Sequence, residues 1–355
     1  MERRGFIKKL SLPLIGLLLG NCNKKVKLKG QKNYIWINLK ELQKNTWEKT
    51  VKSLKANGVD GLLVQADENN LMPINNFTTL AKKYGLEVHF WIITMKHNKK
   101  KVKEEHPEWY VINREGVSCL ENPPYVKDYR WLCPSRESVK NYVQNRCKNI
   151  LDNTNVDGIH LDYIRYPDVI LPEAIQPEYG LNQTKELARF DYCYCEVCRK
   201  KFKEKYGKDP LEMKKPAKNK KWKEYRYNQI TKVVKKVDNV VRKNEKKLTA
   251  AVFPTPNIAR NLVRQDWTEW PLNAVFPMMY HNFYNKPVSW IEKAAQKGTK
   301  ALKGNFPLYS GIFVPELKPE EIKKAARSAK LGGAKGVSIF DLGAMTKKHW
   351  QNFDK

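Results

Sequence analysis

The sequence predicts an α/β protein built as one (β/α)8 barrel, a TIM barrel, with long insertions after the third and fourth strands. Segments rich in β-branched and aromatic residues alternate with helical segments, which is typical of parallel βαβ units. Eight such strand segments can be counted, each followed by helical sequence. No glycine-rich phosphate-binding turn follows the first of them, which argues against an open dinucleotide-binding sheet.

The first three strands are expected at residues 34–39, 61–66 and 87–94. The first is followed by a helix over 42–56 that ends at Asn57-Gly58, a common C-cap pair. The second is followed by a helix near 77–84 that is closed by Gly85. A long segment then precedes a helix at 138–151.

The fourth strand starts at Gly158, and a second long segment separates it from a helix over 225–243. Strands are then expected at 248–253, 274–280, 308–313 and 336–342, with helices at 288–297, at 319–330 and after Met345. Loops at the carboxyl ends of the strands build the active sites of such barrels. We therefore expect function in the two long insertions and the strand ends beside them.

The amino terminus is typical of an export signal. A basic start precedes a short apolar run over residues 10–19, too short to span a bilayer, and then Gly20-Asn21-Cys22. Arg3-Arg4 resembles a twin-arginine signal, and Cys22 stands where a lipoprotein signal places its acylated cysteine. The alternatives are an ordinary secretory signal and a chance cysteine. We expect a signal peptide over 1–21, a linker over 22–32, one domain over 33–355, and anchoring in the bacterial cell envelope through a lipid on Cys22.

The chain is strongly basic, with 67 Lys and Arg against 37 Asp and Glu and a net charge of +30. Such a charge attracts phosphates, anionic lipids or acidic glycans. The lysines are spread along presumed helix faces, however, and no nucleic-acid-binding motif is present. We expect mainly solvated lysine faces and no nucleic-acid partner.

The sequence DGIHLDYIRYP at residues 157–167 carries the strongest catalytic signal. Alternation along a strand places His160 and Asp162 on one face and the neighbouring apolar residues on the other. A buried carboxylate is costly unless it is paired or used in chemistry. Asp162 is therefore the first candidate catalytic residue, with a structural ion pair to Arg165 as the alternative.

Polar and aromatic residues recur at inward positions near the predicted strand ends. Barrel interiors are normally filled by branched apolar side chains, so this set predicts a polar cleft with aromatic walls, which suits sugars. The candidate substrate-binding residues are Trp36, Asn38, Gln65, His89, Trp91, His160, Arg165, Tyr280 and His281.

Three of the seven cysteines form a CxCxxC cluster, Cys193, Cys195 and Cys198. Such a turn can direct three thiolates at one tetrahedral ion, and a structural zinc site needs a fourth ligand. We favour Cys133, with Cys119 behind it and Cys147 as a core thiol. Disulfides remain the alternative in an exported protein.

Several segments resemble the family-10-like glycosyl hydrolases, (β/α)8 barrels found in many bacterial lipoproteins. The specific one is DGIHLDYIRYP, and CxCxxC also resembles, by spacing alone, the zinc loop of family 42 β-galactosidases. Supporting segments are His106 to Tyr110, Trp131 to Pro134, Cys193 to Phe202, Val263 to Trp267 and Phe276 to Tyr280.

The resemblance implies glycoside hydrolysis with Asp162 as one of two carboxylates. The second is not evident, because the fifth strand ends Phe253-Pro254-Thr255-Pro256 without the Glu that many amylase-like barrels place there. Asp341 and Asp67 rank first because each lies at a strand end, with Glu68 and Asp266 behind them.

Three functions stay open at this point. The first is a glycoside hydrolase acting on a polysaccharide or oligosaccharide. The second is a glycan-binding envelope lipoprotein without activity. The third is a metal-dependent, deacetylase-like hydrolase using His89, His97 and Asp162, although no HxH or HxxxH pair supports it.

Overall fold

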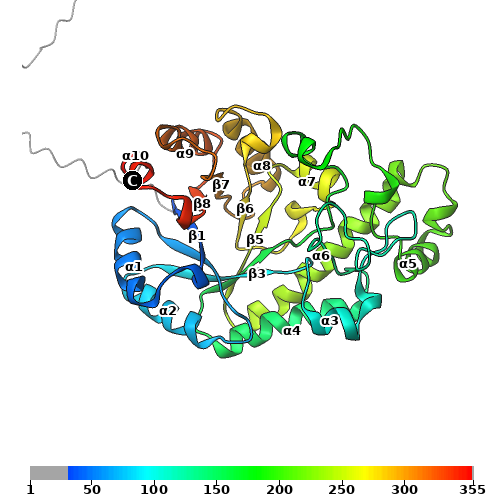
Figure 1. Ribbon diagram of the computed structural model, residues 1–355, viewed down its shortest axis with the longest axis horizontal. Helices are drawn as coiled ribbons and strands as arrows, with labels where there is room; N and C mark the ends of the chain where they lie inside the picture. The colour runs from blue at the N-terminus through cyan, green and yellow to red at the C-terminus, as the bar shows by residue number, and fades with distance from the viewer. Residues whose placement is uncertain (1–30, 354–355) are drawn as a thin grey trace, which may run out of the picture.

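The computed structural model describes residues 31–353 and has eight parallel strands in a nearly closed barrel (Figure 1). The ladder runs β6-β5-β4-β3-β2-β1-β8-β7, and two isolated parallel bridges, Val275 to Leu308 and Met278 to Gly311, join β6 to β7. The predicted fold class is confirmed. The strands are β1 (Tyr34–Asn38), β2 (Gly61–Gln65), β3 (Glu87–Ile93), β4 (Gly158–Asp162), β5 (Lys247–Val252), β6 (Ala274–Pro277), β7 (Ser310–Phe313) and β8 (Val337–Phe340).

Helices surround the barrel and also occupy the insertions. Within residues 31–353, no helix combines the length and the apolar composition that crossing a bilayer requires. The helices are α1 (Trp47–Ala56), α2 (Met72–Lys83), α3 (Lys100–Glu105), α4 (Glu137–Asn153), α5 (Glu196–Tyr206), α6 (Lys220–Lys243), α7 (Pro256–Val263), α8 (Trp290–Leu302), α9 (Ile322–Leu331) and α10 (Lys347–Asn352).

Two cores follow from the alternation of side chains along the strands. Outward residues such as Ile159 and Leu161 of β4 pack between the sheet and the helices. Inward residues form a separate aromatic core inside the barrel, where Trp36 meets Trp91 edge-on at 4.9 Å. The barrel interior is therefore filled mainly by aromatic rings, which support the residues at the carboxyl ends of the strands.

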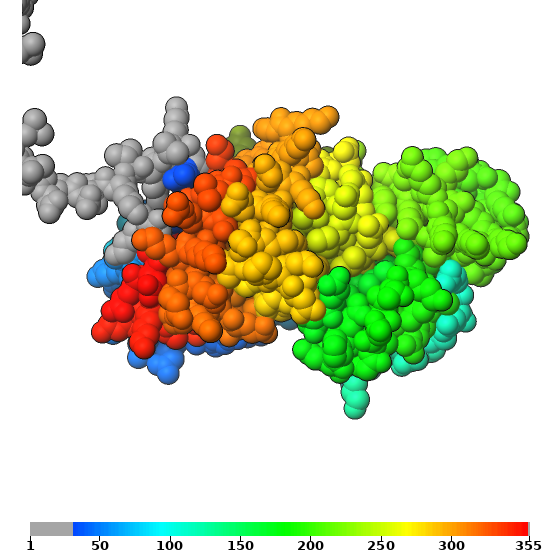
Figure 2. All heavy atoms as spheres, turned by 90° about the horizontal axis from the view of Figure 1, so that it is seen from above, coloured from blue at the N-terminus to red at the C-terminus, as the bar shows by residue number. Residues whose placement is uncertain are grey.

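The insertions after β3 and β4 pack against each other at one end of the molecule. An isolated antiparallel bridge joins Asn113 to Tyr192, and the backbone N–H of Tyr194 donates to the carbonyl of Ile112 at 2.7 Å. Figure 2 shows them, coloured cyan to green, at the end of the molecule away from the red C-terminal segment. This lobe stands beside the carboxyl ends of β3 and β4, where the sequence predicted the functional insertions.

Three helices, α3, α5 and α7, were not specified from the sequence. In α7, Thr255 caps the helix by accepting a hydrogen bond from the backbone N–H of Ile258, and Pro256 occupies the first turn. That cap signal was present in the sequence. Helix α5 starts at Glu196, directly after Cys195. The expected signal peptide, Cys22 and the linker up to residue 30 lie outside the described residues.

Candidate active site

A cavity of about 340 Å³ opens at the carboxyl ends of the strands, between the barrel and the insertion lobe. Its walls are mostly aromatic, and its charged residues are Asp162, Arg165 and Asp168. Both the barrel and the insertions contribute rings. These are Trp36, Trp91, Tyr125, Tyr129, Tyr163, Tyr179, Phe253, Tyr280, Phe283, Tyr284, Phe313 and Phe340.

Asp162 is the last residue of β4 and is only 7% exposed. Its Oδ2 accepts a hydrogen bond from Trp91 Nε1 at 2.9 Å, and its Oδ1 accepts one from the backbone N–H of Tyr163 at 2.7 Å. Burial raises the pKa of the carboxyl, and these two hydrogen bonds offset the rise only in part. A carboxyl with a raised pKa keeps its proton closer to neutral pH, as a general acid must.

Arg165 does not form the ion pair with Asp162 that the sequence left open. Its Nη1 lies 2.9 Å from Oδ2 of Asp168, and its Nη2 donates to the hydroxyl of Tyr129 at 3.0 Å. Tyr129 in turn donates to Asp168. The charge of Arg165 is thus matched by Asp168, and among residues 31–353 no salt bridge to Asp162 is formed.

Asp168 and the tyrosines of the insertions are site residues that the sequence analysis missed. Tyr125 donates its hydroxyl to the backbone carbonyl of Asp168 at 2.7 Å and lines the cavity with Tyr129. The one available signal was the position of Asp168 directly after the YIRYP motif. Loop residues without periodicity gave no indication of which way they point.

His89 and His160 lie beneath the cavity and do not line it, which corrects their assignment to substrate binding. His160 is fully enclosed between the rings of Trp36 and Phe276, and its Nδ1 lies 2.9 Å from the hydroxyl of Thr249. Burial, with the nearby His89, holds the pKa of His160 well below its usual value. The neutral ring therefore supports the floor of the cavity.

A second hollow, of about 470 Å³, adjoins the first through Trp36. Asp341 and Asn38 line it, and Oδ1 of Asp341 accepts a hydrogen bond from the backbone N–H of Ala344 at 3.1 Å. The pKa of Tyr280 is raised well above its usual value by burial and then by the charges of Asp162, Tyr163 and Asp341. Tyr280 thus lies in the field of both candidate acids.

Other predicted site residues are not brought to the cavity. Asp67 has a side chain that is 43% exposed, pairs with Lys40 at 3.6 Å and accepts from the backbone N–H of Asn69. Gln65 and His281 are partly buried and line neither hollow. A strand-end position alone therefore did not identify a cavity residue.

The remaining two acid candidates are bound elsewhere. Glu68 forms an ion pair with Arg146, and Asp266 pairs with Arg260 at 2.7 Å. Neither lines the cavity.

The proposed histidine-containing metal site does not form. Across residues 31–353, the four cysteines 133, 193, 195 and 198 are the only set of three or more His, Cys, Asp and Glu residues whose ligand atoms converge. His97 instead lies 3.1 Å from the hydroxyl of Tyr142, and His89 bonds to Glu87. The deacetylase-like hypothesis is therefore wrong for the site it named.

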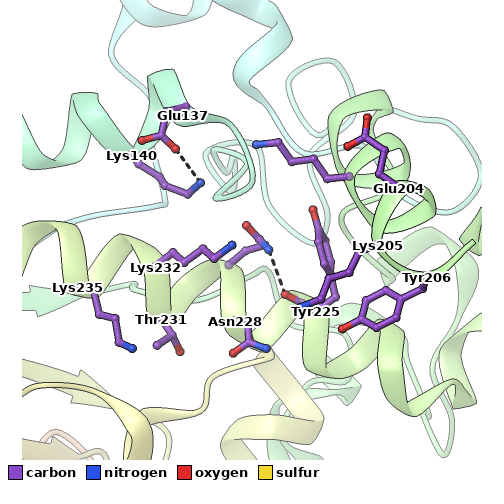
Figure 3. Close-up of a pocket in the computed structure, with 12 residues that line it drawn as sticks. Glu137, Lys140, Glu204, Lys205, Tyr206, Tyr225, Asn228, Thr231, Lys232 and Lys235 are labelled. Carbon is purple, nitrogen blue, oxygen red and sulfur yellow. Dashed lines mark hydrogen bonds and ion pairs between the residues drawn. The ribbon is translucent and has the colours of Figure 1, made fainter.

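A third hollow, of about 740 Å³, lies between α4, α5 and α6 and has different chemistry (Figure 3). Lysines dominate it, and Glu137 and Glu204 are its acids. Neither acid is buried, so this hollow suits anions better than acid catalysis. Its lysines are Lys140, Lys201, Lys205, Lys232 and Lys235.

Solved structures of low sequence identity share the fold. A β-galactosidase from Marinomonas ef1 has a TM-score of 0.62 at 11% identity, over 87% of this chain and 54% of that one. The PgaB (BpsB) glycoside hydrolase domain from Bordetella bronchiseptica has a TM-score of 0.61 at 11% identity, over 87% and 94%. An α-L-fucosidase isoenzyme 2 from Paenibacillus thiaminolyticus has 0.56 at 14%, over 91% and 48%.

This chain thus spans about half the length of the β-galactosidase and nearly all of the PgaB domain. These likenesses show a fold shared with glycosidase barrels. No curated protein matches the sequence significantly. The model of one family matches residues 27–326, which include every strand from β1 to β7 and the whole insertion lobe. The chain belongs to the glycosyl hydrolase-like 10 family.

Proposed function

We propose that the protein is a glycoside hydrolase that cleaves a polysaccharide or oligosaccharide, with Asp162 as its general acid. The observation that carries the proposal is a buried carboxyl with a raised pKa at the floor of an aromatic cavity. Aromatic rings stack on the C–H faces of sugars, and Asp162 lines this cavity from the carboxyl end of β4. The family membership supports the same reaction class.

In this reaction the protonated Asp162 gives its proton to the glycosidic oxygen as the bond to the anomeric carbon breaks. The departing sugar then leaves as an alcohol, and a carboxylate or an activated water attacks the anomeric carbon. Trp91 Nε1 remains as a donor to the Asp162 carboxylate that forms. The aromatic walls keep bulk water away from the reacting oxygen.

For the second carboxylate we propose Asp341. Its single described hydrogen bond, to the N–H of Ala344, leaves most of the acceptor sites of the carboxylate open. Asp168, by contrast, is occupied by Arg165 and Tyr129. Trp36 lines both the hollow of Asp341 and that of Asp162, and both carboxylates act on the pKa of Tyr280, so the two acids lie at adjoining parts of one site.

A glycan-binding protein without activity is the second candidate. One observation favours it: after β5 the cavity is lined by Phe253 and Pro254, with no carboxylate from that loop. An aromatic groove with one competent acid would hold a glycan without cleaving it.

A screen of glycans against the wild type and Asp162→Asn separates the two candidates. Cleavage by the wild type alone, with binding retained in the variant, supports the hydrolase. Binding by both proteins and cleavage by neither, across the screen, supports the glycan-binding protein. Asp67→Asn is the matched control, because Asp67 follows β2 closely but lies outside both hollows.

We also propose that the protein is exported and held in the cell envelope by a lipid on Cys22. This rests on the basic start, the apolar run and the cysteine of residues 1–22. Globomycin inhibits the peptidase that processes lipoproteins, so treated cells would accumulate the precursor. Cys22→Ser should give the same unprocessed precursor.

A further inference from the structure

Four thiols from two insertions converge at one buried point. Cys133 comes from the insertion after β3, and Cys193, Cys195 and Cys198 come from the one after β4. Sγ of Cys133 lies 3.6 Å from that of Cys195 and 3.5 Å from that of Cys198, and all four sulfurs lie within 4.8 Å of one another. Cys119 is not part of the group, since its thiol meets the backbone of Trp131.

The spacing of the sulfurs matches a tetrahedral thiolate site. A zinc ion with sulfurs at about 2.3 Å requires edges of about 3.8 Å between them. Polar groups also point at the sulfurs: the backbone N–H groups of Ile112 and Cys195 donate to Sγ of Cys193, each at 3.5 Å. Amide donors of this kind stabilise thiolates rather than thiols.

Ser135 connects the thiols to the lysine-rich hollow. Its Oγ lies 3.0 Å from Sγ of Cys198 and accepts from the hydroxyl of Tyr225 at 3.4 Å, which leaves the Ser135 proton free for a thiolate. Lys201 donates to the carbonyl of Ser135 at 2.7 Å. In Figure 3 the ammonium groups of Lys140 and Lys232 extend into the same hollow. A zinc ion with four thiolates carries net negative charge, which these cations would balance.

We propose that Cys133, Cys193, Cys195 and Cys198 bind one structural zinc ion that fastens the two insertions together beside the candidate active site. Binding releases the thiol protons to solvent and leaves no ligand position open, so the ion takes no part in the reaction.

The zinc site stands close in sequence and space to the cavity wall. Two residues before Cys133, the ring of Trp131 packs under the guanidinium of Arg165 at 4.7 Å. On the other insertion, Phe190 stacks on Tyr125 at 4.5 Å. Arg165 and Tyr125 both line the cavity. Loss of the ion would therefore loosen this wall before it loosened the barrel. Only the description of this cavity as an active site rests on the proposed function.

The first test measures metal in the full chain, purified without chelator, by inductively coupled plasma mass spectrometry and native mass spectrometry. We expect one zinc ion per chain. Cobalt substitution should give the thiolate charge-transfer bands and the intense visible bands of a tetrahedral site. A wild-type chain without zinc overturns the proposal, whether alkylation before and after reduction then finds disulfides or free thiols.

Cys133→Ser should reduce the zinc content to below about one tenth of an equivalent. Cys147→Ala is the matched control, because Cys147 is a buried thiol of α4 outside the group. It should retain the full equivalent. If Cys133→Ser fails to fold, the metal content of the wild type still decides the matter, and retention of zinc by a folded Cys133→Ser overturns the ligand assignment.

Hydrogen exchange before and after treatment with a chelator tests the effect on the cavity wall. Peptides covering residues 125–131 and 190–198 should exchange at least about tenfold faster without zinc, whereas β1 and β8 should not change. Equal exchange in both states overturns the fastening role. This measurement needs no substrate, so its failure is distinguishable from failure of the proposed glycosidase activity.

Discussion

The indole Nε1 of Trp91 lies 2.9 Å from Oδ2 of Asp162, across the boundary between β3 and β4. Trp91 is inward-facing and 9% exposed, so this hydrogen bond is shielded from water. A donor directed at a carboxylate favours its charged form and lowers its pKa. Trp91 therefore limits how far burial raises the pKa of Asp162 and fixes the direction of the carboxyl.

Trp91→Phe should move the alkaline limb of the kcat/KM pH profile upward. The variant removes the indole donor and keeps a ring of similar shape, so the pKa of Asp162 rises further. We expect a shift of about one pH unit and a loss of kcat of about tenfold, because the acid is less well oriented. The measurement is the pH profile of hydrolysis.

Trp36→Phe is the control for this prediction. Trp36 lines the same cavity, but within the part of the chain that the structure describes its Nε1 has no hydrogen-bond partner. Its substitution should change substrate affinity and leave the pH limb in place. An equal pH shift in both variants would mean that general loosening of the aromatic core, and not the hydrogen bond, controls Asp162.

Alternation along the strands was sufficient to predict the barrel and the direction of Asp162. It did not give depth along the barrel axis: His89 pairs in register with Gly158 at the start of β4, whereas Asp162 ends that strand. His89 does point into the barrel, as predicted, but it lies too deep to reach the cavity. Asp168 and Tyr129 could not be found, because contacts between two irregular insertions leave no period in the sequence.

Replacing Asp341 and Asp168 by alanine, one at a time, should separate the roles of these two acids. If Asp341 is the second carboxylate, Asp341→Ala loses activity by at least about a hundredfold and added azide restores part of it. Asp168→Ala should lose stability, by about 3 kcal/mol, because it leaves the buried guanidinium of Arg165 without its charged partner. Rescue of Asp168→Ala by azide, with none for Asp341→Ala, would exchange these roles.

Asp162 should also make the wild type less stable as the pH rises. The pKa of Asp162 is higher in the folded state than its ordinary value of 3.8. At a pH between these two pKa values, the folded protein therefore binds more protons than the unfolded chain. Unfolding free energy therefore falls as the pH rises from about 3.8 towards the folded pKa. Asp162→Asn lacks this ionisation. The melting temperature of the variant minus that of the wild type should therefore increase as the pH rises from acid to neutral. A constant difference across that range would contradict the raised pKa.

Glu87, at the amino-terminal end of the barrel, should have the opposite effect on the pH dependence of stability. It starts β3, and its carboxylate contacts His89 Nε2 at 2.6 Å, Lys32 at 2.6 Å and Lys247 at 3.0 Å. Burial alone would raise the pKa of Glu87, but the hydrogen bonds and charges of these partners hold it well below its usual range. The stability that Glu87 contributes is therefore present above its ordinary pKa of 4.5 and is lost as the pH falls towards the lower folded value.

Glu87→Gln should accordingly destabilise the protein by about 2 kcal/mol at neutral pH, measured by urea unfolding, and the difference from the wild type should shrink in acid. Glu104→Gln is the control, since Glu104 forms only an exposed pair with Lys100 and should change little. Residues at the amino-terminal face of such barrels serve stability, whereas the carboxyl-terminal face carries chemistry. Glu87→Gln should therefore leave kcat unchanged below its melting range, and a loss of kcat there would show that His89 transmits its position to the floor of the cavity.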